Sequence, residues 1–393
     1  MSTILAVNSG SSTLKFGLFV TENGTENGDE RALLRGSAEG IGKDGGKLEI
    51  LDGGGKQLRH EEKKYASQKE ALDHVAQSIK DFHAERPAAV GHRIVHGGPK
   101  LRDHVRITVE VLKTLDAAVH FAPLHIPTSI DLIRSAEAIY PDVPQFACFD
   151  TAFHQTLPEE AYRYPLPAEF ADEGVRRYGF HGLSYASVVH QLGSALKPRT
   201  VIAHLGNGSS LAAVLEGKSI DTSMGFTPTG GVPMGTRTGD LDPGVLLYLM
   251  RAHKLNDDKL EALLNHKSGL LALGGASDMR ELQKRADAND HDAALAIAIF
   301  CRAIARTVAA FAVSLGGLDA LVFAGGIGEH SAPVRANVCA LLKLVGVAID
   351  PAKNDASSSV LSDEAGGVEV KIVPSQEEAQ IAREVRRLLD RSV

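Results

Sequence analysis

The sequence has few cysteines and no run of a single charge. Its three cysteines (Cys148, Cys301 and Cys339) lie far apart and form no CxxC pair, so we expect reduced, buried thiols that act as small apolar side chains. The formal net charge is −7, and no run of lysine and arginine marks an arm or patch for nucleic acid or a membrane surface. We therefore expect neither nucleic acid nor membrane as a partner.

Long hydrophobic runs are also missing. No apolar stretch reaches the ~20 residues that span a bilayer, and the start "MSTILAVNSG" lacks the charged and apolar regions of a signal peptide. Hydrophobic residues make up 44% of the 393 residues and charged residues 23%, as in soluble globular chains. We expect a cytoplasmic protein of two domains or slightly more, at roughly 100–200 residues per domain.

The segment "AVNSGSSTLKFGLF" near the N-terminus predicts a β-hairpin, because residues 4–19 are apolar on both sides of a serine-rich turn. The lysine of a Walker A loop opens a helix, whereas Lys15 begins a second strand. Backbone N–H groups of a tight Gly/Ser turn bind anions, and hydroxyls add donors. We expect Ser11, Ser12 and Thr13 to face a phosphate; an ordinary polar turn is the alternative.

A similar hairpin is predicted by "VIAHLGNGSSLAAVLEG", which begins at Val201. Its Gly208 lies 198 positions after Gly10, and each glycine is followed by two serines. Two similar hairpins half a chain apart suggest a duplicated α/β unit, although Gly-Ser turns between strands also recur by chance. Two such turns that face each other across a cleft could hold a polyphosphate from both sides.

The remaining pattern alternates helices and strands, which argues for an α/β protein. Helix starts are predicted at Asp242-Pro243, Asp278 and Ser331. A long Ala-rich helix, "DAALAIAIFCRAIARTVAAFAVSL", precedes the strand of "DALVFAGG". The glycines of "FAGGIGEHS" would allow close approach of a base or ribose, which suggests the nucleoside end of ATP. Residues 21–64 read as edge strands and surface loops.

Several charged or titratable residues lie in glycine-rich or β segments. Arg93 and Arg237 have the planar guanidinium that suits carboxylate and phosphoryl oxygens, although a surface ion pair is the alternative for each. His125 and His181 could equally be satisfied core residues. Asp150 and His154 have the i,i+4 spacing of a metal pair, but two ligands are too few to predict zinc.

Eight segments, in order, resemble the motifs of the acetate kinase family. They are "NSGSSTLK", "GHRIVHGG", "FDTAFHQTLP", "RYGFHGLSY", "HLGNGSS", "DTSMGFTPTGGVPMGTRTGDLDP", "SDMRE" and "FAGGIGEHS". The resemblance covers the chain from about residue 4 to "EEAQIARE" near the C-terminus. The resemblance implies the sugar kinase/actin/heat-shock-chaperone ATPase fold, with two duplicated ribonuclease-H-like domains and a cleft between them. We expect residues 1–150 and 376–393 to form the first domain, and residues 151–375 to form the nucleotide-binding second domain.

The resemblance also implies the reaction, which is reversible, ATP-dependent phosphorylation of acetate to acetyl phosphate by in-line transfer. It further implies ATP or ADP as a substrate, Mg²⁺ as the metal (with Mn²⁺ as an alternative) and a homodimer. An acetate carboxylate is ionised at pH 7 and needs no general base, so catalysis should come from cations and oriented donors. In a sugar kinase, the corresponding aspartate would act as a base toward a hydroxyl group. In this chain we instead place Asp150 near the metal or the arginines.

The family motifs assign roles to individual residues of this sequence. The reacting groups would be Asp150, Arg93, His125, His181 and Arg237, and the metal site would include Asn8 and Glu377. The substrate would contact Arg93, Val95, Leu124, Phe180 and Pro228. The nucleotide would contact Ser11, Ser12, Thr13, Lys15, His204, Leu205, Gly206, Asn207, Gly208, Asp278, Met279, Arg280, Gly325, Gly326, Ile327, Gly328 and Glu329.

Two segments depart from the family pattern, and several functions stay open. Ser375-Gln376 replaces a Thr-Asn-like pair, which makes the packing around Glu377 uncertain. The glycines of "TGGVP" (229–233) replace bulkier residues and could enlarge the substrate pocket. Propionate or butyrate is therefore an alternative substrate. A nucleotide-driven chaperone or filament ATPase, and a sugar or polyol kinase, are alternatives of other classes.

Overall fold

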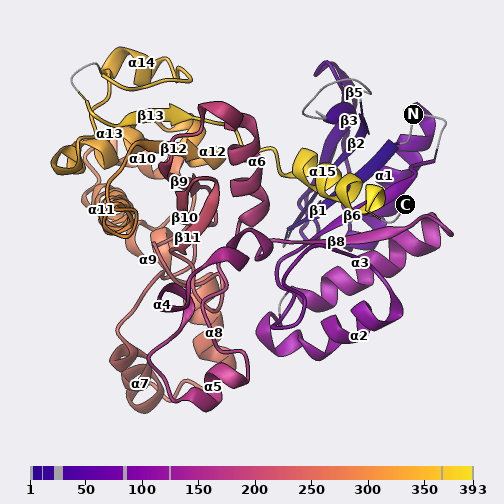
Figure 1. Ribbon diagram of the computed structural model, residues 1–393, viewed down its shortest axis with the longest axis horizontal. Coiled ribbons are helices and arrows are strands. Elements are labelled where there is room, and N and C mark those ends of the chain that lie inside the picture. The colour runs from indigo at the N-terminus through magenta and orange to yellow at the C-terminus, as the bar shows by residue number, and fades with distance from the viewer. Residues whose placement is uncertain are drawn as a thin grey trace. The chain divides into compact units, whose positions relative to one another are not determined.

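The computed structural model describes residues 3–10, 12–21, 30–82, 86–123, 125–363 and 366–391. The chain divides into two compact units (Figure 1), one of Met1–Ala152 with Gln376–Val393 and the other of Phe153–Ser375. The sequence-based division at residues 150 and 376 differs from this one by two residues at the first boundary. Each unit is described by itself.

The first unit is built on one mixed sheet. Its strands are β1 (Thr3–Ser9), β2 (Thr13–Thr21), β3 (Glu30–Glu39), β4 (Lys47–Asp52), β5 (Gln57–Glu62), β6 (Ala89–Ile94), β7 (Val105–Arg106) and β8 (Gln145–Phe149). Its helices are α1 (Gln68–Phe82), α2 (Val109–Ala117), α3 (Ile126–Ile139) and α15 (Glu377–Asp390). In the described residues, the strand order is β5-β4-β3-β2-β1-β6-β8-β7. β1, β6 and β8 are parallel, whereas β1 to β5 form an antiparallel meander.

Helices cover both faces of this sheet. Leu5 and Val7 of β1 belong to a core cluster with the apolar stripes of α1 and α3. Because side chains alternate along a strand, Asn8 faces the opposite way, toward α15, which packs against β1, β2 and β6 (Figure 1). Gly91 of β6 lies under α15 so closely that a Cβ atom would stand 2.6 Å from methyl groups of Ile381 and Val385. The C-terminal helix is thus part of the first unit.

The second unit is built on a smaller mixed sheet. Its strands are β9 (Arg199–Leu205), β10 (Ser209–Leu215), β11 (Lys218–Thr222), β12 (Ala320–Ala324) and β13 (Glu369–Ile372). Its helices are α4 (Glu159–Tyr162), α5 (Ala168–Asp172), α6 (Gly182–Leu192), α7 (Pro243–Ala252), α8 (Asp257–His266), α9 (Gly269–Gly274), α10 (Met279–Asp287), α11 (His291–Ser314), α12 (Gly325–His330), α13 (Ala332–Leu341) and α14 (Pro351–Asp355). The strand order in the described residues is β11-β10-β9-β12-β13.

The two sheets share one topology, which confirms the predicted duplicated fold. In each, the first strand pairs antiparallel with the second and parallel with a later strand, and that strand pairs parallel with a final one. β3-β2-β1-β6-β8 of the first sheet therefore corresponds to β11-β10-β9-β12-β13 of the second. The first sheet adds β4, β5 and β7 at its edges.

The letter match between the two hairpins does not follow the structure. The backbone N–H of Gly10 opens its turn by donating to the Thr13 carbonyl at 2.8 Å, and the N–H of Gly206 does the same to the Gly208 carbonyl at 3.1 Å. Gly10 thus corresponds to Gly206, and the spacing of 198 pairs the opening residue of one turn with the closing residue of the other. The two hairpins correspond to each other in the structure, but their Gly-Ser-Ser sequences do not occupy corresponding positions.

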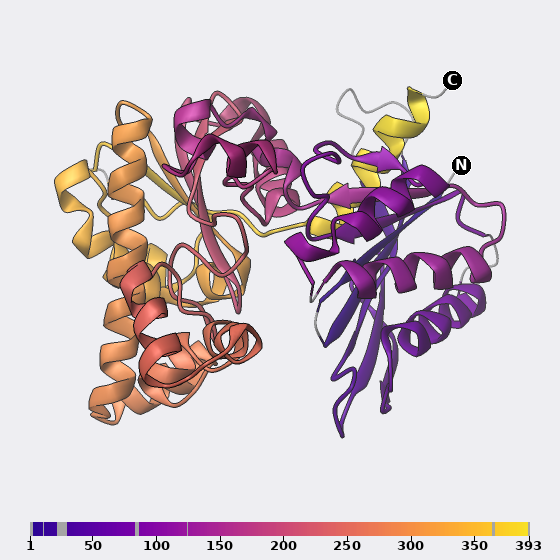
Figure 2. The same cartoon turned by 90° about the horizontal axis from the view of Figure 1, so that it is seen from below.

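The long helix α11 corrects another expectation. By length and composition alone, α11 could cross a membrane, and it is one such helix among the described residues. The sequence analysis had found no apolar stretch of that length. Its buried residues, including Phe300, Ile304 and Val308, belong to the main core of the second unit. Figure 2 shows α11 at full length, in orange. Packing against β9 and β10 accounts for its composition.

The predicted helix starts are confirmed by their caps. The carboxylate of Asp242 accepts a hydrogen bond from the N–H of Gly244 at the start of α7, with Pro243 at the first helical position. Asp278 caps α10 and Ser331 caps α13 in the same way. Each cap satisfies an N–H group that has no partner inside the helix.

Candidate active site

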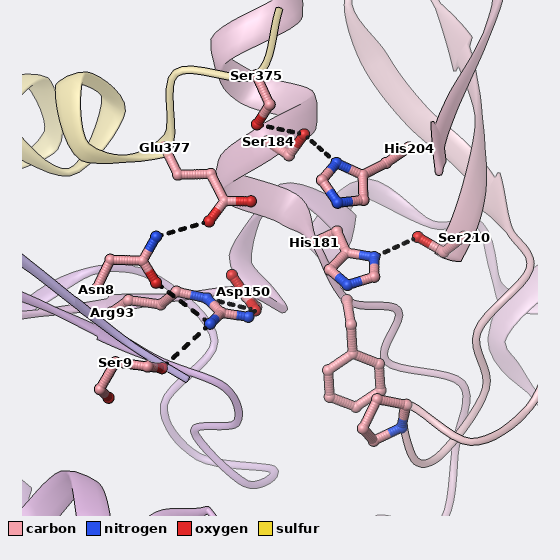
Figure 3. Close-up of polar contacts among 12 residues, drawn as sticks. Asn8, Ser9, Arg93, Asp150, His181, Ser184, His204, Ser210, Ser375 and Glu377 are labelled. Atoms are coloured by element: carbon pink, nitrogen blue, oxygen red, sulfur yellow. Dashed lines mark hydrogen bonds and ion pairs between the residues drawn. The ribbon is translucent and has the colours of Figure 1, made fainter. Parts of the chain in front are cut away.

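The ends of three neighbouring parallel strands bring together the polar residues of the first unit. Asn8 lies near the end of β1, Arg93 near the end of β6, and Asp150 directly after β8. The carboxyl ends of parallel strands meet at one edge of a sheet, where open α/β sheets bind ligands. Figure 3 shows the side chains of Asn8, Arg93 and Asp150 pointing toward one another.

Arg93 and Asp150 form a buried ion pair. Nε and Nη2 of Arg93 donate to the same oxygen, Oδ2 of Asp150, at 3.0 and 2.5 Å. The exposed fraction of the side chain is 16% for Arg93 and 1% for Asp150. The remaining terminal nitrogen, Nη1, makes longer bonds of 3.3 Å to the Ser9 carbonyl and to Oδ1 of Asn8. Asp150 therefore fixes one edge of the guanidinium, and the other edge is held loosely.

Asn8 connects this pair to the C-terminal helix. Its Nδ2 donates to Oε2 of Glu377 at 2.9 Å and to Oε1 of Glu378 at 2.8 Å. Both glutamates lie in the first turn of α15, where carboxylates favour the positive end of the helix dipole. Glu378 was not among the predicted site residues, although it is the second letter of the same "EE" pair.

The electrostatics of this group are dominated by carboxylates. Burial raises the pKa of Asp150 above its ordinary value, and the negative charge of Glu377 acts in the same direction, whereas Arg93 lowers it. Burial disfavours the charged form of Arg93, but the charges of Asp150 and Glu377 outweigh it and raise the pKa of the guanidinium. The negative charges of Asp150, Glu377 and Glu378 thus all favour the charged form of the Arg93 guanidinium.

These groups fit a hard divalent cation in part. Among described residues, the buried Oδ1 of Asp150 has no hydrogen-bond partner, and carboxylate oxygens are the ligands that Mg²⁺ prefers. No group of three or more His, Cys, Asp or Glu within the described residues could hold a metal ion by itself. Mg²⁺ ordinarily uses one or two carboxylates together with substrate phosphates and waters. Asp150 and Glu377 fit a site of this kind, in which substrate phosphates and waters complete the coordination of the ion.

The predicted phosphate turn closes the β1–β2 hairpin. The amide of Gln68, which the sequence analysis did not identify, donates to the Gly10 carbonyl at 2.8 Å and so fixes the turn. Ser12 and Thr13 are half-buried, and Ser11 lies outside the described residues. Lys15 is exposed and stands opposite Asn8 in the hairpin register, so both side chains lie on the same face of the sheet.

His181 stands at the centre of the corresponding group in the second unit. It precedes α6 with a backbone φ of 57°, a left-handed conformation that is uncommon outside glycine and is often retained at functional sites. Its Nδ1 lies 2.8 Å from Oγ of Ser210, and that oxygen lies 2.5 Å from the hydroxyl of Tyr185.

His204 stacks on His181. The ring centroids are 4.5 Å apart, with 30° between the planes. Nδ1 of His204 lies 2.7 Å from Oγ of Ser184, which accepts a hydrogen bond from the hydroxyl of Ser375 at 2.9 Å (Figure 3). His204 and Ser210 are direct cross-strand partners on β9 and β10, so they lie on one face of the sheet, the face that α6 covers.

Arg237 and His181 meet at the second glycine turn. A Cβ atom on Gly208 would stand 3.2 Å from Nε2 of His181 and 3.7 Å from Nη1 of Arg237. Nη1 of Arg237 also donates to the Pro228 carbonyl at 3.1 Å. The structure therefore brings this predicted pair together over a backbone that has no side chain in the way.

His154 has a structural environment that does not suit the predicted metal pair with Asp150. Its Nδ1 lies 2.7 Å from Oγ of Ser219, and its Nε2 lies 3.1 Å from the Phe180 carbonyl. Both ring nitrogens are therefore in use, and Nε2–H holds the backbone just before His181. Burial lowers the pKa of His154 to about 4.

The predicted nucleotide residues fall into two groups. Leu205 and Met279 have buried side chains within the core of the second unit, so only their backbones are available to a ligand. Asn207 and Arg280 are exposed. Gly326 has open space around it, whereas Gly325 has a φ of 74° and approaches the Leu205 carbonyl too closely for any side chain.

The apolar substrate residues are described in part. Val95 and Phe180 are buried, Pro228 and His125 are half-buried, and Leu124 lies outside the described residues.

The glycines of "TGGVP" form a tight turn. Gly231 has a φ of 92°, and a Cβ atom there would stand 2.8 Å from the Ser223 carbonyl. Its N–H donates to the carboxylate of Asp240 at 2.7 Å. Gly231 therefore serves close backbone contact, and a side chain in its place would clash with the Ser223 carbonyl.

Ser375, the other departure, is well held. Its N–H donates to the carboxylate of Glu329 at 3.1 Å, and its hydroxyl donates to Ser184. Two hydrogen bonds therefore hold Ser375 in place, although it departs from the family pattern.

The buried His154 predicts a pH-dependent stability. The unfolded chain binds a proton near pH 6.5 and the folded chain only near pH 4, so the free energy of unfolding falls as the pH drops through that range. Between pH 7 and 5 we expect the wild type to lose about 2 kcal/mol more than the variant His154→Gln. Urea unfolding at both pH values measures this. Equal losses would contradict it, and the exposed His291→Gln is the control.

The chain is similar to known proteins over nearly its whole length. The sequence model of the Acetokinase family matches residues 3–383. An acetate kinase of Carboxydothermus hydrogenoformans is 40% identical over 98% of this chain and 99% of its own length. The crystal structure of Porphyromonas gingivalis acetate kinase has a TM-score of 0.86 at 37% identity, covering 99% of this chain and 100% of that chain. A propionate kinase from Francisella tularensis has a TM-score of 0.90 at 37% identity, covering 98% and 99%. Matched over nearly its whole length, the chain belongs to the acetokinase family.

Proposed function

We propose that this protein transfers the γ-phosphoryl group of ATP to acetate, reversibly, to give acetyl phosphate and ADP. The observation that carries the proposal is the meeting of His181 and Arg237 over Gly208. Two nitrogen atoms that lie close to the same glycine, where the backbone carries no side chain, suit a phosphoryl group that is negatively charged throughout its transfer. Membership of the acetokinase family supports the same reaction.

The chemistry needs charge compensation more than proton transfer. An oxygen of the acetate carboxylate forms a bond to the γ-phosphorus as the bond to the β-phosphate oxygen breaks, and ADP leaves with that electron pair. No proton moves in this step, because the nucleophile is already ionised at neutral pH. The barrier comes from bringing an anion to an anion, which cations and oriented N–H donors lower.

Arg93 is the proposed carboxylate anchor. Asp150 holds Nε and Nη2, whereas Nη1 makes two bonds of 3.3 Å that a substrate carboxylate could replace at shorter distance. In this proposal, Asp150 orients the guanidinium and does not act as a base. Its other oxygen, Oδ1, has no partner among the described residues.

Asp150 and Glu377, with Asn8 between Arg93 and Glu377, are the residues that would hold Mg²⁺. When bound, this ion would neutralise charge on the phosphate oxygens of ATP. Mn²⁺ has similar oxygen-ligand chemistry and is the alternative. Lys15, on the same face of the hairpin as Asn8, is proposed to contact the phosphates.

Acetate is the first choice of substrate, and propionate is the second. Val95 and Phe180 are buried, and Gly231 packs tightly against the Ser223 carbonyl, which supports the smaller acid. One methylene in an apolar pocket discriminates by only about 1–3 kcal/mol. Solved structures of an acetate kinase and a propionate kinase match this chain at the same identity.

A substrate panel tests the proposal. We expect ATP-dependent phosphorylation of acetate with the highest kcat/KM, weaker activity on propionate, still weaker activity on butyrate, and none on glycerol. A coupled assay for ADP, with hydroxylamine trapping of the acyl phosphate, measures this. Preference for propionate would select the alternative substrate. Hydrolysis of ATP that no carboxylate stimulates would favour the chaperone or filament ATPase, and activity on glycerol would favour a polyol kinase.

We further propose a homodimer in a reducing, cytoplasmic compartment. Helix α7 has no buried residue, yet Leu247, Tyr248 and Met250 are apolar and 43–61% exposed, as expected of a surface that a second copy covers. The three cysteines are free and buried, which supports the compartment.

The α7 surface makes a prediction about oligomeric state. At micromolar concentration, we expect a dimer for the wild type and for Leu344→Asp, an exposed leucine outside α7. Leu247→Asp should yield monomers, because it places a charge in the covered apolar surface. Sedimentation velocity measures all three. A monomeric wild type would contradict the homodimer, and a dimeric Leu247→Asp would contradict its assignment to α7.

A further inference from the structure

The two stacked histidines of the second unit are held in the same way. Nδ1 of His181 contacts the hydroxyl of Ser210, and Nδ1 of His204 contacts the hydroxyl of Ser184. In each case, the serine contacts a further hydroxyl, that of Tyr185 or Ser375. These two rows of hydroxyl, serine and imidazole lie between α6 and the sheet, and Figure 3 shows the serine–histidine contacts.

The direction of the hydrogen bonds decides the tautomer of each ring. A phenol is a stronger acid than an aliphatic alcohol, so Tyr185 donates to Ser210 within their 2.5 Å contact. The hydroxyl hydrogen of Ser210 then points to Nδ1 of His181, 2.8 Å away. In the other tautomer, the hydrogen on Nδ1 of His181 and the hydroxyl hydrogen of Ser210 would both point into the short contact between these two atoms. Because Ser210 is fully buried, a misdirected O–H would be costly.

The second row has the same direction. The hydroxyl of Ser375 donates to Ser184 at 2.9 Å, and Ser184 is fully buried. Its hydrogen therefore points to Nδ1 of His204, at 2.7 Å. Both imidazoles accept a bond at Nδ1, and a neutral imidazole that accepts at one nitrogen carries its hydrogen on the other.

We propose that the rows Tyr185–Ser210 and Ser375–Ser184 fix His181 and His204 as Nε2–H donors, which makes Ser210 and Ser184 positioning residues. The inference rests on the proposed function, in which Nε2 of His181 faces the transferring phosphoryl group. In this tautomer, the ring presents N–H to anionic oxygen. In the other tautomer, it would present a lone pair, which repels the same oxygen.

The rows also argue against a second use of the stacked rings. Two Nε2 lone pairs side by side would be a candidate for binding a transition metal, because neutral imidazole binds metal through a bare nitrogen. With hydrogens on both Nε2 atoms, the rings are hydrogen-bond donors instead. Metal binding at this pair is therefore an outcome that would count against the proposal.

Nitrogen-15 NMR of histidine-labelled protein tests the tautomers directly, without substrate. At pH 8, we expect the Nε2 signal of His181 in the range of a protonated nitrogen and the Nδ1 signal in the range of an unprotonated one. The signals are assigned by their loss in His181→Asn. In Ser210→Ala, we expect a mixture of tautomers. A wild-type ring with hydrogen on Nδ1, or an Nε2 shift on adding Zn²⁺, would overturn the proposal.

Kinetics give the second readout. We expect Ser210→Ala to lower kcat about 10- to 100-fold, by analogy with the loss of hydrogen-bond partners that orient histidines at metal sites, with the KM for acetate changed less than twofold. Ser210→Thr, which keeps a hydroxyl, should restore most of the rate. The matched control is Ser187→Ala, which removes a buried hydroxyl from α6 that donates to a backbone carbonyl.

The two readouts separate the inference from the proposed function. Fixed tautomers without carboxylate phosphorylation would leave the positioning role intact and reject the reaction. Normal kcat in Ser210→Ala together with an unchanged tautomer would reject the positioning role and leave the reaction intact.

Discussion

The ion pair between Arg93 and Asp150 is the constraint on which the first unit's site depends. Charges buried to this degree are stable only when paired and hydrogen-bonded, and removing one partner of such a pair typically costs about 3–5 kcal/mol. The pair joins β6 to the residue after β8, and Asn8 extends the connection from β1 to the first turn of α15. The C-terminal helix therefore has to return to this sheet for its carboxylates to be satisfied.

In the second unit, uncharged hydroxyl groups orient the side chains of the proposed site. His181 and His204 are oriented by serine hydroxyls, and Nη1 of Arg237 donates to the Pro228 carbonyl. The two units thus contribute different properties to the proposed reaction. The first supplies a carboxylate anchor and oxygen ligands for a cation, and the second supplies donors for the phosphoryl group.

Sequence patterns predicted the parts of this arrangement that depend on local order along the chain. Alternation around two turns located both hairpins, and the caps at Asp242, Asp278 and Ser331 located helix starts. The placement of Ser210 opposite His204 was not predictable, because it depends on the register between two strands. Tyr185 and Ser184 act through the face of α6 that meets the sheet, which no spacing reveals.

Glycine was the least informative letter. Gly10 and Gly208 match in the sequence but occupy opposite ends of their turns, since a Gly-Ser-Ser run carries no information about which residue opens the turn. The glycines of 229–231 looked like a widened pocket, whereas Gly231 adopts a φ that disfavours other residues and lies against the Ser223 carbonyl. Whether a glycine provides space or close contact depends on its neighbours in three dimensions.

The kcat of Arg237→Ala with ATP and acetate is the most direct measurement of the central claim, that positive charge and oriented donors carry the transfer. Losing one donor to a transition state typically costs about 10²–10³ in kcat, and we expect that loss without a change in unfolding midpoint. Arg163→Ala, which removes an exposed ion pair with Glu159, is the matched control. Arg237→Ala with a kcat within twofold of the control would contradict the account.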